Sequence, residues 1–183
     1  IRKPLILSGP VGVGKFAVAR AVARSFICEE PQPDGMPCEE CGICGDEFGG
    51  FGIFEIDARG HEANVLSTVR AALDKPTFAD HRVVIIENAD AALSLDTFLK
   101  IMEVERVDVT FILCTSALEK LSGAIRSRSN EFVLQALQPF ETRRLAVEYL
   151  AANQNAPACN SVLDILPAIS TNLPGRLFVL CKQ

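Results

Sequence analysis

Three glycines and a lysine stand at the spacing that cradles a phosphate group. Gly9, Gly12 and Gly14 precede Lys15 in the segment GPVGVGK, which fits the pattern G-x-x-x-x-G-K. Glycines let backbone N–H groups turn toward phosphates, and the lysine ammonium reaches the β- and γ-phosphates. An apolar run precedes the segment and a helical pattern follows it, so we expect a phosphate loop rather than an accidental glycine-rich turn.

Two positions that an ATPase needs are replaced. The residue after the lysine is usually Ser or Thr, whose hydroxyl binds Mg²⁺, but here it is Phe16. The strand VVII should end in an acidic pair that binds the metal and polarises water, but the chain has Glu87 and Asn88. An amide cannot accept a proton from water. We therefore expect hydrolysis to be lost, whereas binding of ATP or ADP stays open.

Four cysteines lie within seventeen residues at metal-binding spacing. Cys28, Cys38, Cys41 and Cys44 form the pattern C-x9-C-x2-C-x2-C. Zinc prefers four ligands in a tetrahedron, and paired C-x2-C thiolates are a strong indication of it. The surrounding insertion has few apolar residues, so a metal would supply its order. We expect a closed structural zinc site.

Other chemistries for this cluster are weaker. Disulfides are rare in reducing compartments, and an iron–sulfur cluster is possible from ligand number alone. Acidic residues surround the cysteines, which disfavours a DNA-gripping zinc finger; they are Glu29, Glu30, Glu39 and Glu40. The other cysteines, Cys114, Cys159 and Cys181, lie among apolar neighbours and are expected to be buried.

Composition predicts a folded protein, and the clustered cysteines fit a reducing cytoplasm. The 183 residues are 49% hydrophobic, and the net charge of −5 gives no long-range attraction to nucleic acid. No apolar run reaches the length of a membrane span, and no signal peptide is visible. The chain opens without Met, so we expect a fragment of a longer protein.

Strand and helix patterns alternate over the first three quarters of the chain. Apolar runs predict strands at 4–8, 52–56, 83–86, 109–114 and 130–134. Helical spacing marks 16–27, 64–73 and 91–102, and 118–125 reads as a short helix or turn. Such alternation predicts an α/β fold whose parallel sheet is covered by helices on both faces.

The strand patterns stop after Pro139. Helical patterns follow at 141–153, 161–170 and 175–181. We therefore expect two domains: an α/β phosphate-loop domain over 1–137, carrying the cysteine module at 28–44, and a small all-helical domain over 138–183.

Two long segments carry a specific resemblance. RVVIIENADAALSLDTFLKIME and TFILCTSALEKLSGAIRSRSNEFVL closely resemble the AAA+ subunits of the bacterial DNA polymerase III clamp loader. Those subunits share the same order of parts: phosphate loop, four-cysteine zinc insertion, acidic strand end and IRSR loop. The similarity runs from Leu5 to about Leu180. It implies an AAA+ domain followed by a helical lid. The C-terminal collar domain through which such subunits oligomerise is missing here, so the resemblance implies that the fragment alone is a monomer.

The resemblance also implies roles for single residues. Thr115, at the end of TFILCT, matches the sensor position that contacts the γ-phosphate. Arg128, in Ser127-Arg128-Ser129, matches the arginine finger that reaches into a neighbouring subunit's ATP site, where a guanidinium stabilises transition-state charge. Arg126 would lie on the other face if this segment were extended, and we assign it no role.

The family has two nearby types. Gamma/tau subunits hydrolyse ATP, whereas delta-prime is a rigid member that does not and donates its finger. Phe16, Asn88 and the pair Pro174-Gly175 resemble delta-prime, while the segment Glu55–Ala58 is closer to gamma/tau. We therefore expect a non-hydrolysing scaffold, with an active gamma/tau-type ATPase as the alternative and a zinc-dependent nucleic-acid-binding module as the weakest reading.

The resemblance also implies partners. They are the other loader subunits, gamma/tau and delta, and, through the complex, the sliding clamp and primed DNA. No membrane is implied.

Overall fold

The computed structural model describes residues 3–44, 52–59, 62–74, 81–91, 99–101, 108–152 and 160–181. The chain divides into two compact units. Unit 1 comprises residues 1–8 and 15–133, and unit 2 comprises residues 9–14 and 134–183. The predicted domain boundary at 137/138 stays a prediction.

Unit 1 is built on a parallel sheet in the order β2-β3-β4-β1-β5. The strands are β1 (Leu5–Ser8), β2 (Ile53–Asp57), β3 (Arg82–Glu87), β4 (Val109–Thr115) and β5 (Asn130–Val133). All seven residues of β4 are buried, as are the first five of β3. Central parallel strands are covered on both faces and therefore read as continuous apolar runs. The predicted α/β fold with a parallel sheet is confirmed.

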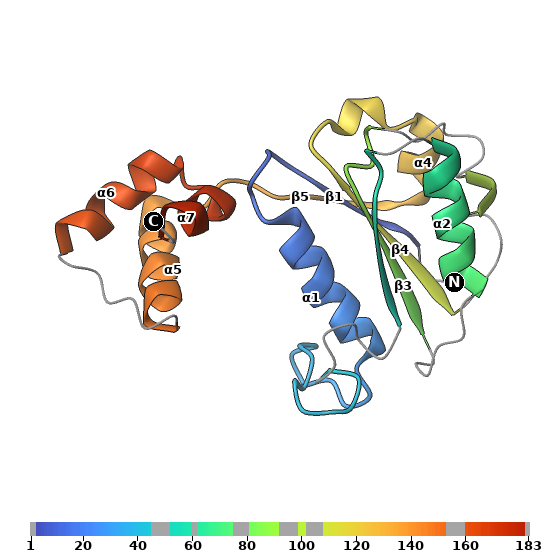
Figure 1. Ribbon diagram of the computed structural model, residues 1–183, viewed down its shortest axis with the longest axis horizontal. Helices are drawn as coiled ribbons and strands as arrows, with labels where there is room; N and C mark the ends of the chain where they lie inside the picture. The colour runs from blue at the N-terminus through green and yellow to red at the C-terminus, as the bar shows by residue number, and fades with distance from the viewer. Residues whose placement is uncertain are drawn as a thin grey trace. The chain divides into compact units, whose positions relative to one another are not determined.

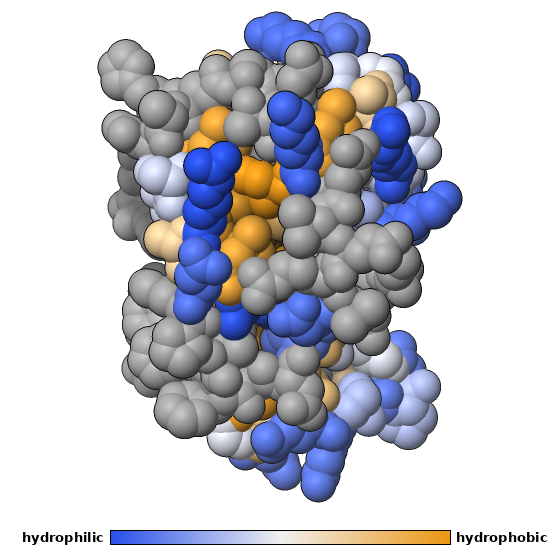
Figure 2. All heavy atoms as spheres, turned by 90° about the vertical axis from the view of Figure 1, so that its right-hand side faces the viewer, coloured by the Kyte–Doolittle hydropathy of each residue, from blue (hydrophilic) through white to orange (hydrophobic). Residues whose placement is uncertain are grey.

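Helices cover both faces of this sheet (Figure 1). On one face, α1 (Lys15–Ile27) packs Ala19, Ala23 and Ile27 against alternate strand residues. On the other face, α2 (Glu62–Asp74) and α4 (Gly123–Arg128) bury Val69 and Ile125. Figure 2 faces the side of α2 and α4 and shows apolar side chains gathered between hydrophilic ones. This two-sided packing fixes the carboxyl ends of the strands, where the candidate residues lie.

A buried arginine closes one end of α2. Arg82 is only 5% exposed. Its Nη1 donates to the carbonyl oxygen of Ala72 at 2.9 Å and also to that of Leu73. The last carbonyls of a helix lack partners within the helix and carry partial negative charge. Arg82 therefore joins the start of β3 to the C-terminus of α2.

Unit 2 contains three helices among its described residues. They are α5 (Pro139–Ala152), α6 (Asn160–Ser170) and α7 (Pro174–Cys181). Their core is a small aliphatic cluster of Ala146, Leu150, Leu163, Leu166 and Leu177. The predicted helical C-terminal region is present.

Some sequence predictions fall elsewhere. Most of the predicted helix 91–102 lies outside the described residues; of its described part, Leu99–Ile101 are helical. Cys159 also lies outside the described residues. Cys114 is buried as predicted, whereas Cys181 is only half-buried because it ends α7. Among the described helices, none combines the length and apolar character that a membrane span requires.

Candidate functional site

The glycines of the predicted phosphate loop have backbone conformations that suit glycine. Gly9, Gly12 and Gly14 have φ of 152°, 86° and 96°. A Cβ on Gly9 would lie 2.4 Å from the Leu134 carbonyl oxygen, so no other residue fits there without a shift. The Gly12 carbonyl accepts a hydrogen bond of 2.8 Å from the Gly175 amide, within unit 2. Strain and close contact explain why glycine recurs at this spacing.

Lys15 begins α1 and contacts the end of β4. Its Nζ donates to the Ser116 hydroxyl oxygen at 2.9 Å. Partial burial lowers the pKa of Lys15, while the negative charges that Cys114, Asp90 and Glu87 can carry oppose that shift. The Lys15 ammonium is thus half-buried, and its hydroxyl partner is Ser116, a residue that the sequence analysis did not select.

Thr115, the predicted phosphate sensor, is fully buried. Its hydroxyl donates to the Asp90 carboxylate at 2.6 Å and accepts from the Ala117 amide at 3.0 Å. Burial would raise the pKa of Asp90, but the bonds from Thr115 and the Ser116 amide outweigh it and lower that pKa. The Thr115 hydroxyl is therefore engaged with Asp90, and Ser116 is the neighbour that faces Lys15.

The Phe16 ring packs into unit 1. It lies against the apolar cluster between α1 and the sheet, and the Arg20 guanidinium carbon sits 4.9 Å from the ring centroid. Arg20 also pairs with Glu55 on β2, where Nη2 and Oε2 are 2.7 Å apart. A ring held in this way offers no oxygen to a metal, as the sequence analysis expected of this residue type.

Asn88 follows β3 in a left-handed conformation, with φ of 53°. Its side-chain amide donates to Asp57, at the end of β2, at 2.9 Å. Arg59 also binds the Asp57 carboxylate, and its hydrogen bonds are the main cause that lowers the pKa of Asp57. Glu87 ends β3 and is half-buried. The pair that would activate water in an ATPase is therefore one carboxylate and one tethered amide.

The two arginines of the IRSR segment lie on a helix, not on an extended strand. Ser122 caps α4 by accepting a bond from the Ile125 amide at 3.3 Å. Arg126 pairs with Glu131 at 2.8 Å, whereas Arg128 is exposed and its Nη1 donates to the Ala124 carbonyl at 3.1 Å. Arg126 is thus tied to β5, and Arg128 stands at the exposed end of the helix.

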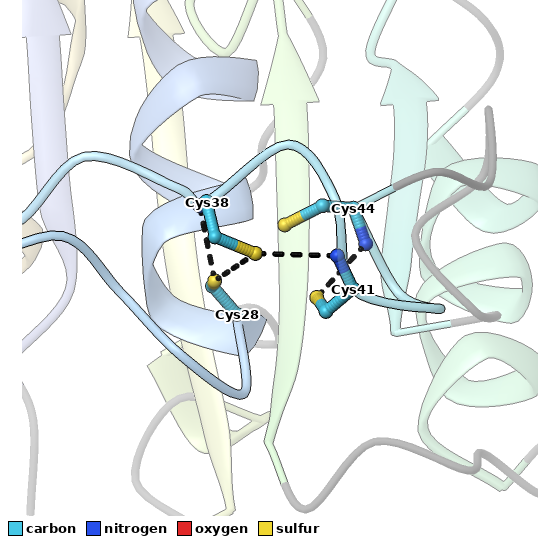
Figure 3. Close-up of side chains that lie close together, drawn as sticks. All are labelled: Cys28, Cys38, Cys41 and Cys44. Atoms are coloured by element: carbon cyan, nitrogen blue, oxygen red, sulfur yellow. Dashed lines mark hydrogen bonds between the residues drawn. The ribbon is translucent and has the colours of Figure 1, made fainter.

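The four cysteines of the insertion point their sulfur atoms toward one another (Figure 3). All four Sγ atoms lie within 4.8 Å of one another, and all four cysteines are free thiols. Cys28 and Cys38 Sγ are 3.5 Å apart, whereas a disulfide requires about 2.05 Å. Sulfurs bound to one zinc ion at about 2.3 Å would lie about 3.8 Å apart, so this set fits a tetrahedral metal.

Backbone amides support this arrangement. The amides of Cys38, Cys41 and Cys44 each donate to the sulfur of the preceding cysteine of the cluster, at 3.3 to 3.4 Å. Amides of Glu29 and Cys44 lower the pKa of the Cys41 thiol to about 6, while burial raises the pKa of Cys44 to about 12. A metal that binds thiolates would hold all four deprotonated. The donor set therefore fits a closed structural site.

The sequence analysis did not select Ser116, Asp90 or Asp57 as site residues. Ser116 follows Thr115, Asp90 stands two residues after Asn88, and Asp57 ends β2, so each lies at or just after the carboxyl end of a strand of the parallel sheet. Side chains at that edge meet in space. Polar residues at the strand ends could therefore have pointed to these three positions. They do not reveal which hydroxyl faces Lys15.

The chain matches a protein family described as DNA polymerase III, delta subunit, over residues 1–138. Among curated relatives, the gamma subunit of Buchnera aphidicola (Schizaphis graminum) is 31% identical over 72% of this chain and 38% of its own length. The gamma/tau subunit of Mycobacterium tuberculosis H37Rv is 30% identical over 79% and 26%. The Escherichia coli tau subunit is 31% identical over 78% and 23%. The chain thus spans well under half of each relative.

Solved structures show the same fold. The RuvB Holliday junction branch migration motor of Thermotoga maritima has a TM-score of 0.67 at 14% identity, covering 100% of this chain and 54% of that one. A DNA polymerase III gamma-subunit-related protein from the same organism has a TM-score of 0.52 at 19% identity, covering 80% and 45%. At such identities the likeness supports the predicted AAA+ fold alone.

Proposed function

We propose, from the premise that this chain belongs to the DNA polymerase III delta-subunit family, that it acts as a subunit of the sliding-clamp loader in DNA replication. Within the loader it would be a non-hydrolysing AAA+ scaffold of the delta-prime type that donates Arg128 to a neighbour's ATP site. The observation that carries this proposal is an exposed Arg128 on a domain whose own magnesium and water-activating positions are replaced.

The absence of hydrolysis rests on two side chains. The Phe16 ring is packed against the core of unit 1, and Asn88 is bonded to Asp57. Phosphoryl transfer needs a metal that bridges the β- and γ-phosphates and a group that orients water. Neither residue can supply its part, and no other hydroxyl is adjacent to Lys15 in the sequence.

Arg128 is suited to act on a neighbouring chain. Its α4 neighbour Arg126 is engaged with Glu131, which braces the last turn of the helix against β5. Arg128 itself is exposed and contacts a backbone carbonyl, an interaction that is weaker than an ion pair with a phosphate. A guanidinium placed on a γ-phosphate in trans is worth about 10³ to 10⁵ in rate.

The second candidate is a gamma/tau-type ATPase. It is favoured by the relatives, which are gamma, tau or gamma/tau subunits. Under that reading, the glycine loop and Lys15 bind ATP and unusual residues replace the two missing groups. Phe16 and Asn88 weigh against it, since both changes affect the same reaction step.

Nucleotide binding itself is compatible with either candidate. We propose that Lys15 with Ser116, rather than Thr115, would meet the phosphates of ATP or ADP, because the Thr115 hydroxyl is buried and bonded to Asp90. Structural zinc in Cys28, Cys38, Cys41 and Cys44 would order the insertion and leave no open coordination position.

The proposed partners follow from loader membership. They are gamma/tau and delta subunits and, through the complex, the sliding clamp and primed DNA, in the cytoplasm.

The test uses the assembled loader. Arg128→Ala is expected to leave assembly intact and to lower ATP turnover at the neighbouring site by about 10³-fold or more. The matched control is Arg126→Ala, which removes a guanidinium from the same helix and should leave turnover within about twofold, because the worth of an exposed ion pair is small. Unchanged turnover in Arg128→Ala would refute the finger.

A second measurement separates the two candidates. A loader in which every other subunit carries an inactivated phosphate-loop lysine should show no ATP turnover above background. Turnover that depends on Lys15 in that assembly would establish the gamma/tau-type reading instead.

A further inference from the structure

Asp90 makes two hydrogen bonds to the end of β4, and the assignments above give Asp90 itself no role. Its Oδ1 accepts from the Thr115 hydroxyl at 2.6 Å and from the Ser116 amide at 3.1 Å. Thr115 is fully buried, and Ala89, next to Asp90, is 1% exposed. Both sides of the contact are therefore anchored in the core, and the bonds tie the segment after β3 to the segment after β4.

Backbone bonds reinforce the same junction. The Ala89 amide donates to the Cys114 carbonyl at 2.9 Å, and the Ala117 amide donates to the Thr115 hydroxyl oxygen at 3.0 Å. The Thr115 hydroxyl thus donates to Asp90, after β3, and accepts from the Ala117 amide, after β4. With Thr115 and the Ser116 amide both held, the direction in which the exposed Ser116 side chain leaves the backbone is restricted.

The free end of that side chain meets Lys15. Ser116 Oγ accepts from Lys15 Nζ at 2.9 Å, across 101 positions of sequence. We propose that Asp90 is a positioning residue of the phosphate site: by holding the Thr115 hydroxyl and the Ser116 amide, it places the Ser116 hydroxyl against Lys15. This inference rests on the proposed phosphate role of Lys15 and adds the group that orders its partner.

Asp90 acts on Lys15 in two separable ways. Its negative charge favours the ammonium directly, and its hydrogen bonds act through Ser116. Asp90→Asn removes the charge but keeps an oxygen that can accept from Thr115 and Ser116, whereas Asp90→Ala removes both. The difference between these two variants therefore isolates positioning from charge.

The test follows the acylation rate of Lys15 with an N-hydroxysuccinimide acetate, measured by mass spectrometry relative to the exposed Lys100. We expect Asp90→Ala to raise the rate about three- to tenfold over Asp90→Asn, the factor that one hydrogen bond contributes. Ser116→Ala should raise it by a similar factor. In the Ser116→Ala background, Asp90→Ala should raise the acylation rate no more than Asp90→Asn does. Without the Ser116 hydroxyl, Asp90 has nothing to position, and only the loss of its charge remains.

Equal rates in Asp90→Ala and Asp90→Asn would overturn the proposal, as would independent multiplication of the Asp90→Ala and Ser116→Ala effects. Thr115→Val keeps a similar buried shape and removes the hydroxyl donor, so it repeats the test if Asp90→Ala fails to fold. Its expected effect has the same sign and is smaller, because the Ser116 amide still binds Asp90.

Binding of inorganic tripolyphosphate adds a second readout. Calorimetry should give a dissociation constant about three- to tenfold weaker for Asp90→Ala than for Asp90→Asn. Equal affinities of the two variants would contradict the proposal. If the unaltered protein binds no tripolyphosphate, the phosphate site itself fails, and the acylation series still decides whether Asp90 positions Ser116.

Discussion

The side-chain amide of Asn88 donates a hydrogen bond of 2.9 Å to the carboxylate of Asp57. These residues lie at the carboxyl ends of neighbouring parallel strands, with Asp57 ending β2 and Asn88 following β3. Asn88 adopts φ of 53°, a left-handed conformation that Asn accepts more readily than most residues. In the proposed function, the position at which an ATPase carries a water-activating Glu therefore joins the ends of β2 and β3 instead.

We predict that Asn88→Glu destabilises the protein and creates no ATPase. The change places a carboxylate against Asp57 and removes the amide donor. It also puts Glu, which adopts the left-handed backbone conformation less readily than Asn, at a position with positive φ. Each effect is worth about 1 kcal/mol, so unfolding in urea should report a loss of about 2 to 3 kcal/mol. ATP turnover should stay at background, because Phe16 still occupies the magnesium position.

The control for this prediction reverses the polarity of the pair. In the double variant Asp57→Asn with Asn88→Glu, an amide at 57 can donate to a carboxylate at 88. We expect the double variant to lose less stability than the sum of the two single variants. Strict additivity would mean that the contact between positions 57 and 88 has no energetic role.

The fold follows from patterns that are visible in the sequence. The runs Val83–Ile86 and Val109–Cys114 are apolar throughout because both faces of their strands are covered. Helical periodicity and the phosphate-loop spacing place α1 between the first two strands. The order of strands in the sheet is not visible in this way, because it depends on which edges pair after the helices have packed.

The candidate site is less predictable for the same reason. β4 is buried along its whole length, so no alternation of polar and apolar residues tells which side chain at its end faces Lys15. Sequence reasoning selected Thr115 as the phosphate sensor, which stays a prediction, and gave no sign that the Ser116 hydroxyl lies against Lys15. The partner of Asn88 is equally hidden, since Asp57 lies 31 positions away.

Acid sensitivity should follow the ion pair between Arg59 and Asp57. The Arg59 hydrogen bonds lower the pKa of Asp57 below its unfolded value of about 3.9. A carboxyl group with a depressed pKa contributes stability above its unfolded pKa, and that contribution is lost as pH falls through the folded pKa. Arg59→Met should therefore lower the melting temperature at pH 7, and the difference from the unaltered protein should shrink toward pH 2.

Arg176→Met provides the matched comparison for this pH series. Its guanidinium donates to the Thr171 hydroxyl at 3.2 Å, and that hydroxyl does not titrate. The melting-temperature effect of Arg176→Met should therefore vary less with pH than that of Arg59→Met. Parallel pH profiles for the two variants would show that Asp57 does not carry the effect.

Metal removal should unfold the cysteine module and spare the sheet. We expect about one zinc ion per chain, bound by Cys28, Cys38, Cys41 and Cys44. A chelator should expose these thiols to alkylation and speed amide exchange in residues 28–44, because the module has little apolar surface to bury. The buried Cys114 should stay protected, which makes it an internal control.

Replacing single cysteines tests the same site from the protein side. Cys41→Ser should lower the zinc content sharply, whereas Cys181→Ser should leave it unchanged, since Cys181 lies on α7 outside the cluster. A visible iron–sulfur absorption band, or a folded module with no metal at all, would contradict zinc.

The last prediction concerns Phe16, which follows Lys15 and which we propose replaces a magnesium ligand. Phe16→Thr restores the residue type of a working phosphate loop but removes a half-buried ring and its contact with Arg20, 4.9 Å away. Loss of this burial and of the cation–π contact should lower the free energy of unfolding by about 1 to 3 kcal/mol. Phe16→Leu keeps most of the apolar contact and should lose less. Neither variant should hydrolyse ATP, because Asn88 is unchanged; turnover by Phe16→Thr alone would show that a carboxylate at position 88 is dispensable in this protein.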